Sequence, residues 1–231
     1  MPIKLQKPRI NNKSAIATEV TNKLYSVNPW ANFVPSYPKK EVHGWNGNHP
    51  ALKRLALNGA DATGANIIVD VGVWLGSSVI NMASELKNNK INGCVIAVDT
   101  FLGSPEHWSM ENYFDRVNGF PNLYQQFLTN IYNAELTEYV IPLPQTSISA
   151  AMILKAAGIA PNVVHVDAAH EYPEVLKDIE AYYELLPTGG CLIGDDYDPT
   201  WPGVIQAANE FAAKQVLYLE VESPKFILRK R

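Results

Sequence analysis

Residues 67–83, IIVDVGVWLGSSVINMA, contain the pattern that decides the fold. An apolar run rich in β-branched residues reaches Asp70, and Gly72 and Gly76 follow in a turn before Ser77 opens a helical pattern. Glycine lets a turn tighten and lets the backbone approach a ligand closely. The free N–H groups at the start of the helix can hold an anionic group. The stretch therefore predicts a strand, a ligand-binding turn and a helix.

The alternation of strand and helix continues along the chain. Further strands are predicted at 94–99, 139–143, 163–167 and 191–196, with a C-terminal hairpin at 215–221 and 225–229. The first four of these runs are apolar on both faces, as expected for strands that helices cover on both sides. We expect an α/β fold with a doubly wound, Rossmann-like sheet that is mostly parallel, has helices on both faces and carries the antiparallel hairpin at its edge.

Composition and charge restrict the possible functions. The chain has 231 residues, of which 47% are hydrophobic and 18% charged, a balance typical of a folded globular domain. A formal charge of −4 argues against a broad electrostatic grip on nucleic acid. The sequence has no apolar run of about 18 residues and no apolar segment of a signal peptide at its beginning. We therefore expect a cytoplasmic protein without nucleic acid or membrane partners.

The chain is expected to have two unequal parts. Prolines are frequent in residues 1–41, and proline interrupts helices and sheets, so this part is predicted to be an N-terminal arm or cap. Residues 42–231 form the main domain, in which the aromatic-rich stretch at about 103–135 is predicted to be a partly helical lid. The proline-rich arm and the many aromatic residues are compatible with a homodimer.

A second acidic residue supports a nucleoside ligand. The strand that follows the glycine turn ends at Asp99, where a carboxylate can accept hydrogen bonds from the two hydroxyls of a ribose. Trp74 stands where a dinucleotide-binding turn needs glycine, and its bulk would crowd a pyrophosphate. The pattern favours a ligand with an adenosine but no diphosphate. Alternatively, the stretch between Gly72 and Ser77 binds no ligand and is only a tight strand-to-helix turn with a capping serine.

Residues 70–78, DVGVWLGSS, match the first motif of the class I S-adenosylmethionine-dependent methyltransferases, acidic-x-Gly-x-x-x-Gly-x-Ser. Within that class, the chain resembles the small metal-dependent O-methyltransferases of the catechol and macrolide-sugar types over roughly residues 42–220. The resemblance implies a seven-stranded sheet, a methyltransferase domain at 42–231 and S-adenosylmethionine as cofactor. It also assigns cofactor-binding residues: Asp70, Gly72, Gly76 and Ser77 at the methionine end, Asp99 at the ribose, and Gln145, Thr146 and Ser147 at the adenine.

Three carboxylates follow two strands that we expect to be neighbours. Asp167 ends one strand, and Asp195 and Asp196 end the other. Ends of adjacent parallel strands lie about 5 Å apart. Repulsion would then force one carboxylate to take up a proton unless a cation lies among them. Oxygen ligands suit Mg²⁺, so the sequence predicts a site for Mg²⁺ or another divalent cation. Each Asp alone could instead cap the next helix.

His170 lies three residues after Asp167, in the turn that leads to the next helix. A neutral histidine is a good general base. In the metal-dependent methyltransferases a base follows a metal-binding Asp at this spacing, Lys in the catechol type and His in the sugar type. The resemblance thus implies His170 as catalytic base and a small-molecule or sugar hydroxyl as acceptor. The alternative is a histidine that only hydrogen bonds to the loop backbone. His165, inside an apolar strand, is predicted to be a core residue.

Three aromatic residues are predicted to contact the acceptor, with ordinary packing as the alternative for each: Trp108, Tyr197 and Trp201. Trp45 is predicted to close the cofactor side. Other functions stay open. In a metal-independent methyltransferase the acids would only cap helices. A non-haem-iron hydroxylase-like enzyme would need two histidines and one carboxylate, and this region offers one histidine too few. A non-catalytic adenosine-binding protein is a further alternative.

Overall fold

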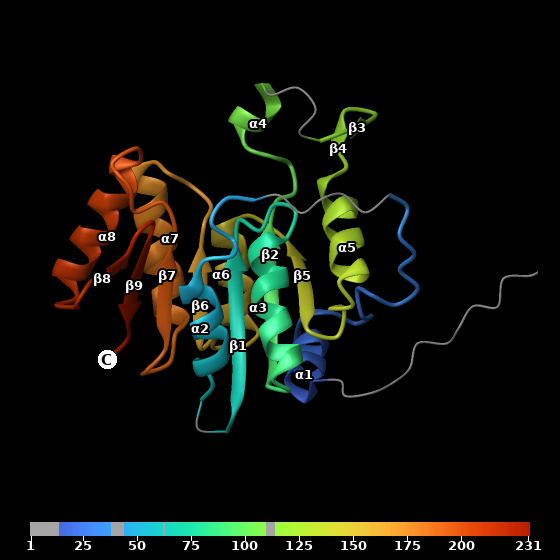
Figure 1. Ribbon diagram of the computed structural model, residues 1–231, viewed down its shortest axis with the longest axis horizontal. Helices are drawn as coiled ribbons and strands as arrows, with labels where there is room; N and C mark the ends of the chain where they lie inside the picture. The colour runs from blue at the N-terminus through green and yellow to red at the C-terminus, as the bar shows by residue number, and fades with distance from the viewer. Residues whose placement is uncertain (1–13, 38–43, 62, 110–113) are drawn as a thin grey trace, which may run out of the picture.

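The computed structural model describes residues 14–37, 44–61, 63–109 and 114–231. At its centre lies a seven-stranded sheet with the order β5-β2-β1-β6-β7-β9-β8 (Figure 1). The strands are β1 (Ala65–Val71), β2 (Asn92–Asp99), β5 (Val140–Pro144), β6 (Val163–Val166), β7 (Cys191–Gly194), β8 (Glu220–Glu222) and β9 (Lys225–Arg229). The first five are parallel, and β9 pairs antiparallel with both β7 and β8. The predicted fold class is confirmed.

Strand order reverses between β1 and β6. From β1 the chain proceeds outward to β2 and β5, and then returns to add β6 and β7 on the other side. In such sheets ligands bind beyond the carboxyl ends of the strands, where the order reverses. Residue Asp70 of β1 is paired with His165 of β6 in this register. The strand ends that carry the predicted acids therefore meet at the switch point.

Helices cover both faces of the sheet, because successive strand residues point to opposite sides and are apolar on both. One face is covered by α1 (Ala15–Leu24), α6 (Ser147–Ala156), α7 (Tyr172–Leu185) and α8 (Pro202–Lys214). The other face is covered by α2 (Pro50–Asn58), α3 (Ser77–Asn88) and α5 (Leu123–Asn133). Helix α2 begins at Pro50, because the fixed φ of proline suits the first turn of a helix, and it ends before Gly59.

The described part of the predicted N-terminal arm packs on the sheet. Residues 14–37 contain α1, whose Val20 is buried against β2 and β5. The Tyr25 hydroxyl donates to the carbonyl of Pro142 at 2.6 Å, and the indole of Trp30 donates to that of Val140 at 2.7 Å. This segment therefore shares the core of the main domain. Residues 1–13 and 38–41 of the arm lie outside the described residues.

The predicted lid region divides into two parts. The short helix α4 (Pro105–Ser109) and the hairpin of β3 (Arg116–Val117) and β4 (Phe120–Pro121) stand above the carboxyl edge of the sheet (Figure 1). Helix α5, by contrast, packs on the sheet with Phe127 and Ile131 fully buried. Residues 110–113 lie outside the described residues.

The C-terminal hairpin is shorter than the sequence predicted. Strand β8 begins only at Glu220, because α8 continues to Lys214 and a turn follows it. Val216 adopts a left-handed φ of 54°, and the N–H of Leu217 returns to the carbonyl of Ala212 at 2.8 Å, which closes the helix. None of the helices in the described ranges has the length and apolar character needed to cross a bilayer.

Candidate methyl-transfer site

A cavity of about 370 Å³ opens at the carboxyl ends of the strands around the switch point. One wall consists of the loop 44–47, the turn 72–74 and the first turn of α3. Asp167, His170, Asp196 and Trp201 also line the cavity. Glycine-turn residues and two of the three predicted metal-binding acids, which lie far apart in the sequence, thus share one cavity.

The glycine turn is required by the close approach of two strand ends. Gly72 has a left-handed φ of +86°, and a Cβ atom at this position would lie 1.7 Å from the carbonyl oxygen of Asp167. The N–H of Asp167 in turn donates to the carbonyl of Val71 at 2.9 Å. Any side chain at Gly72 would push β1 and β6 apart, so this residue fixes where Asp167 lies relative to the turn.

Asp167, His170 and Asp196 form what we call the outer cluster. Each offers a ligand atom, and these atoms all lie within 4.8 Å of one another. Nε2 of His170 lies 2.9 Å from Oδ2 of Asp196, and the imidazole stacks on the indole of Trp201 with ring centroids 3.9 Å apart. The His170 and Asp196 side chains are partly exposed, 32% and 21%. A molecule in the cavity can therefore reach the outer cluster.

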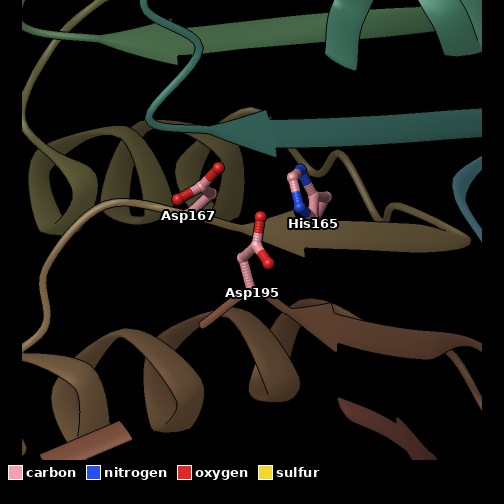
Figure 2. A group of neighbouring side chains, drawn as sticks. All are labelled: His165, Asp167 and Asp195. Carbon is pink, nitrogen blue, oxygen red and sulfur yellow. The ribbon is translucent and has the colours of Figure 1, made fainter. Parts of the chain in front are cut away.

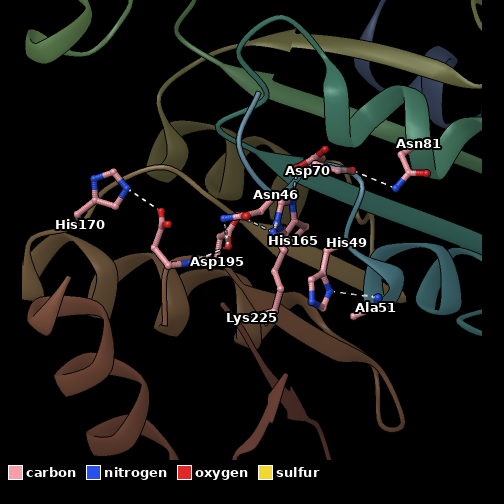
Figure 3. Close-up of polar contacts among 11 residues, drawn as sticks. Asn46, His49, Ala51, Asp70, Asn81, His165, His170, Asp195 and Lys225 are labelled. Atoms are coloured by element: carbon pink, nitrogen blue, oxygen red, sulfur yellow. Dashed lines mark hydrogen bonds and ion pairs between the residues drawn. The ribbon is translucent and has the colours of Figure 1, made fainter. Parts of the chain in front are cut away.

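A second group of charged residues lies behind it, without access to solvent. Asp70, His165, Lys225 and Asp195 form this buried tetrad (Figure 3). Nδ1 of His165 lies 2.7 Å from Oδ1 of Asp70, and Nζ of Lys225 lies 3.0 Å from Nε2 of His165. Lys225 also donates to Oδ2 of Asp195 at 2.5 Å. Since an ammonium group only donates, Nε2 of His165 accepts and Nδ1 donates to Asp70.

The two groups approach each other at Asp167 and Asp195, which follow β6 and β7 and whose carboxylate oxygens lie within 4.8 Å (Figure 2). Burial raises the pKa of Asp167 well above its usual value, and the neighbouring carboxylate of Asp195 raises it further, while Lys225 acts in the opposite direction. A cation bound at the outer cluster would relieve this unfavourable environment. Carboxylate oxygens and an imidazole nitrogen are also donors that a divalent cation accepts, so the residues fit such an ion.

The predicted cofactor residues divide into those at the cavity and those away from it. Gly72 and Ser77 line the cavity. Asp70 does not, because it is fully buried in the tetrad. Gly76 is the residue before α3, with its Cα facing the ring of Phe127. The structure thus brings two of the four residues predicted at the methionine end into contact with the cavity.

The residues predicted at the ribose and the adenine lie outside the cavity. The carboxylate of Asp99 accepts hydrogen bonds from the N–H groups of Trp74, at 2.9 Å, and Phe101, at 2.7 Å, and burial raises its pKa. Thr146 caps α6, and Ser147 donates to Asp178 at 2.5 Å. Gln145, next to them, is exposed. In this structure Asp99 stabilises the glycine turn, Thr146 caps α6, and Ser147 links α6 to α7.

Of the predicted acceptor residues, Trp201 lines the cavity and the other two do not. Trp108 is 46% exposed and packs its ring under the guanidinium of Arg116, 4.2 Å from the ring centroid. The hydroxyl of Tyr197 accepts a hydrogen bond from Asn209, and its ring packs against Phe226. Of these three aromatic residues, Trp201 is therefore the one that can contact a molecule bound in the cavity.

Several functional candidates were not predicted from the sequence. Lys225 was not singled out, although a lysine at the start of the apolar strand KFILR was a signal. Asn46 donates to Asp195 at 3.3 Å from the loop 44–47, and the backbone of Gly47 accepts from Asn81 of α3 at 3.0 Å. The glycine-rich sequence around Asn46 was the only hint of its loop.

A mostly parallel sheet with this order, a glycine turn at the switch point and a cavity that carries carboxylates and a histidine are features of a class I S-adenosylmethionine-dependent methyltransferase. The model of a family described as methyltransferase domain matches residues 69–197, more than half of the chain. The chain belongs to this methyltransferase family. Comparison with curated proteins gives no match.

Solved structures of methyltransferases share the fold. The O-methyltransferase NovP is 20% identical, with a TM-score of 0.58 over 78% of each chain. CalS11, a TDP-rhamnose 3'-O-methyltransferase of calicheamicin biosynthesis, is 19% identical, with a TM-score of 0.52 over 78% of this chain and 76% of that one. An O-methyltransferase from Bacillus cereus in complex with SAH is 18% identical, with a TM-score of 0.56 over 96% and 94%. At these identities the similarity concerns the fold.

Proposed function

We propose that this protein transfers the methyl group of S-adenosylmethionine to a hydroxyl oxygen of a small molecule, with a sugar or glycoside as the preferred acceptor class. The reaction depends on Mg²⁺ or another divalent cation, and His170 is the general base. The observation that carries the proposal is the outer cluster. It combines two carboxylates and an imidazole within 4.8 Å, on the cavity that also contains the glycine turn.

The outer cluster has the parts that an O-methyltransferase needs. A neutral hydroxyl is a poor nucleophile, so it must lose its proton as the methyl group is transferred. A divalent cation, when bound by Asp167 and Asp196, stabilises the negative charge that develops on oxygen. His170 accepts the hydroxyl proton. Asp196, whose Oδ2 lies 2.9 Å from Nε2 of His170, orients the imidazole and stabilises the imidazolium that forms.

Methyl transfer itself leaves little covalent work to the protein. S-adenosylmethionine, when bound, supplies an electrophilic methyl group; the C–O bond forms as the C–S bond breaks, and that bond's electron pair stays on sulfur in S-adenosylhomocysteine. The turn at Gly72 and the first turn of α3 hold the donor. Trp201 stacks against His170 and supports the face of the acceptor. Positioning of this kind can supply about 7–11 kcal/mol of the barrier in favourable cases.

The alternative of a non-haem-iron enzyme receives less support from the geometry. Such a site needs two histidines and one carboxylate around open positions. The second nearby histidine, His165, is fully buried and uses both ring nitrogens, one with Asp70 and one with Lys225. A metal-independent methyltransferase remains the second candidate, favoured by one specific contact: the pairing of Asp195 with Lys225 already neutralises one of the three acids without a metal.

The test is a methyl-transfer assay with radiolabelled S-adenosylmethionine and a panel of sugars, glycosides and phenols, each with Mg²⁺ and with a chelator. The proposal expects transfer to a hydroxyl that the chelator abolishes and Mg²⁺ restores. Transfer that is unchanged by the chelator would support the metal-independent enzyme. Calorimetry with S-adenosylhomocysteine, without metal, measures the donor site separately; absence of binding there would contradict the cofactor assignment. The homodimer and the cytoplasmic location stay predictions.

A further inference from the structure

Asp195 and Asp196 are neighbours in the sequence, but their surroundings differ completely. Asp195 is 4% exposed and lies inside the tetrad, whereas Asp196 lines the cavity. The chain turns sharply between them, because Asp196 has a left-handed φ of 60°. The backbone thus sends one carboxylate into the protein and the other toward the cavity.

The carboxylate of Asp195 is fully engaged by protein donors. Oδ2 receives the ammonium of Lys225 at 2.5 Å. Oδ1 accepts from the side chain of Asn46 at 3.3 Å and from the N–H of Asp196 at 2.8 Å (Figure 3). A cation bound to Asp195 would have to displace one of these donors. The outer carboxylate of Asp196 faces no lysine or arginine in any contact among the described residues.

Lys225 reaches Asp195 because of the strand order. It is the first residue of β9, the antiparallel neighbour of β7, and Phe226 is paired with Gly194. Its Nζ atom is completely buried, and besides Asp195 it contacts only the nitrogen of His165 in the described structure. A buried ammonium needs a full counter-charge, and Asp195 is the carboxylate that it contacts. Lys225 and Asp195 therefore neutralise each other's charge inside the protein.

We propose that Lys225 binds Asp195 as its permanent counter-ion and so excludes it from the metal's ligands, leaving Asp167 and Asp196 as the cation-binding carboxylates. This inference rests on the proposed function and refines its metal site. Lys225 is a positioning residue: it decides which of three adjacent acids carry the charge that the cavity presents. The sequence alone assigned all three to the metal.

The test is the binding of Mn²⁺ alone, measured from the EPR signal of free Mn²⁺ and by calorimetry, in a double-mutant cycle. The variants are Asp195→Asn, Lys225→Met and the two combined, with Asp196→Asn for comparison. The combined variant replaces the ion pair by a neutral pair of similar volume, which often folds as well as the original. We expect it to bind Mn²⁺ within about 3-fold of the wild type, because no ligand is lost. Asp196→Asn is expected to weaken binding about 10- to 100-fold.

Lys214→Met is the matched control, since it removes a lysine from an exposed ion pair with Glu180. It should leave Mn²⁺ affinity unchanged. If the combined variant loses as much affinity as Asp196→Asn, Asp195 is a ligand and the inference is wrong, while the proposed function stands. If the wild type does not bind Mn²⁺, the metal part of the proposed function fails, and this inference fails with it. If Lys225→Met alone does not fold, the combined variant still tests whether Asp195 is a metal ligand.

Discussion

The buried tetrad and the outer cluster are built from the same kinds of residue at the same edge of the sheet, yet only in the tetrad is a carboxylate paired with a lysine. In the tetrad Lys225 contacts Asp195 and His165, and His165 contacts Asp70, so most polar atoms have a partner. In the outer cluster Asp167 and Asp196 lie close to His170, and all three side chains line the cavity. Residue type alone therefore does not distinguish a structural acid from a functional one; burial and the partner do.

The difference also separates stability from activity. Removing one partner of a buried ion pair leaves an uncompensated charge and costs folding free energy. Removing a partly exposed group at a cavity costs mainly the chemistry that it performs. The following experiments test this separation.

The largest effect is expected at the outer histidine. His170→Ala should lower the methyl-transfer rate about 10²- to 10⁴-fold, the usual contribution of a general base, because the hydroxyl proton loses its acceptor. Assays at increasing pH should recover part of the rate. Urea unfolding should show a free energy of unfolding within about 1 kcal/mol of the wild type, since the side chain is partly exposed. A large loss of stability would place His170 with the tetrad instead.

Lys225→Ala is expected to produce the largest loss of stability. The change leaves Asp195 buried without its cation, which should lower the free energy of unfolding by about 3–5 kcal/mol. Urea titration measures the loss. The exposed pair of Lys155 and Glu184 provides the control, because Lys155→Ala should cost about 1 kcal/mol or less. Equal costs for the two variants would mean that the tetrad is not a stabilising unit.

A third buried acid sharpens the comparison, because no lysine or arginine of the described ranges pairs with it. Asp178 is 5% exposed and accepts a hydrogen bond from Ser147; burial raises its pKa to about 6. The native state therefore holds the proton more strongly than the unfolded chain, so this residue's contribution to stability is present at low pH and is lost as pH rises through about 6. Asp178→Asn should be stabilising above pH 6 by up to about 3 kcal/mol and less so at pH 4.

Thermal unfolding at several pH values measures this effect. The wild type should lose stability relative to Asp178→Asn between about pH 4 and pH 6. A stability difference that does not change with pH would show that Asp178 is already ionised in the native state throughout this range.

The smallest effect is expected from the aromatic partner of His170. Trp201→Ala removes a stacked ring at the cavity and should reduce kcat/KM for the acceptor about 5-fold, or about 1 kcal/mol. Trp201→Phe should retain most of the activity. Affinity for S-adenosylhomocysteine, measured by calorimetry, should not change. A loss of donor affinity would move Trp201 to the donor side of the cavity.

Much of the fold could be predicted from local pattern. The first strand, the alternation of strands and helices and the mostly parallel sheet followed from apolar runs and turn residues. The exceptions have physical causes. Helix α1 lies in a proline-rich segment, and its burial against β2 depends on tertiary packing. At the other end, the strand predicted from residue 215 begins only at Glu220, because the turn that closes α8 occupies the residues after Lys214.

The sequence by itself determined that Asp167, His170 and Asp196 meet, because they follow two strands whose ends the α/β pattern makes neighbours. Only the tertiary structure decided that Asp70 and Asp195 turn inward. The partner of Asp195, Lys225, comes from an antiparallel strand near the chain's end, and no local pattern specifies which strand supplies the partner of a given acid. Side-chain spacing is a short-range property of the chain, whereas the balance of buried charge depends on groups that only folding brings together.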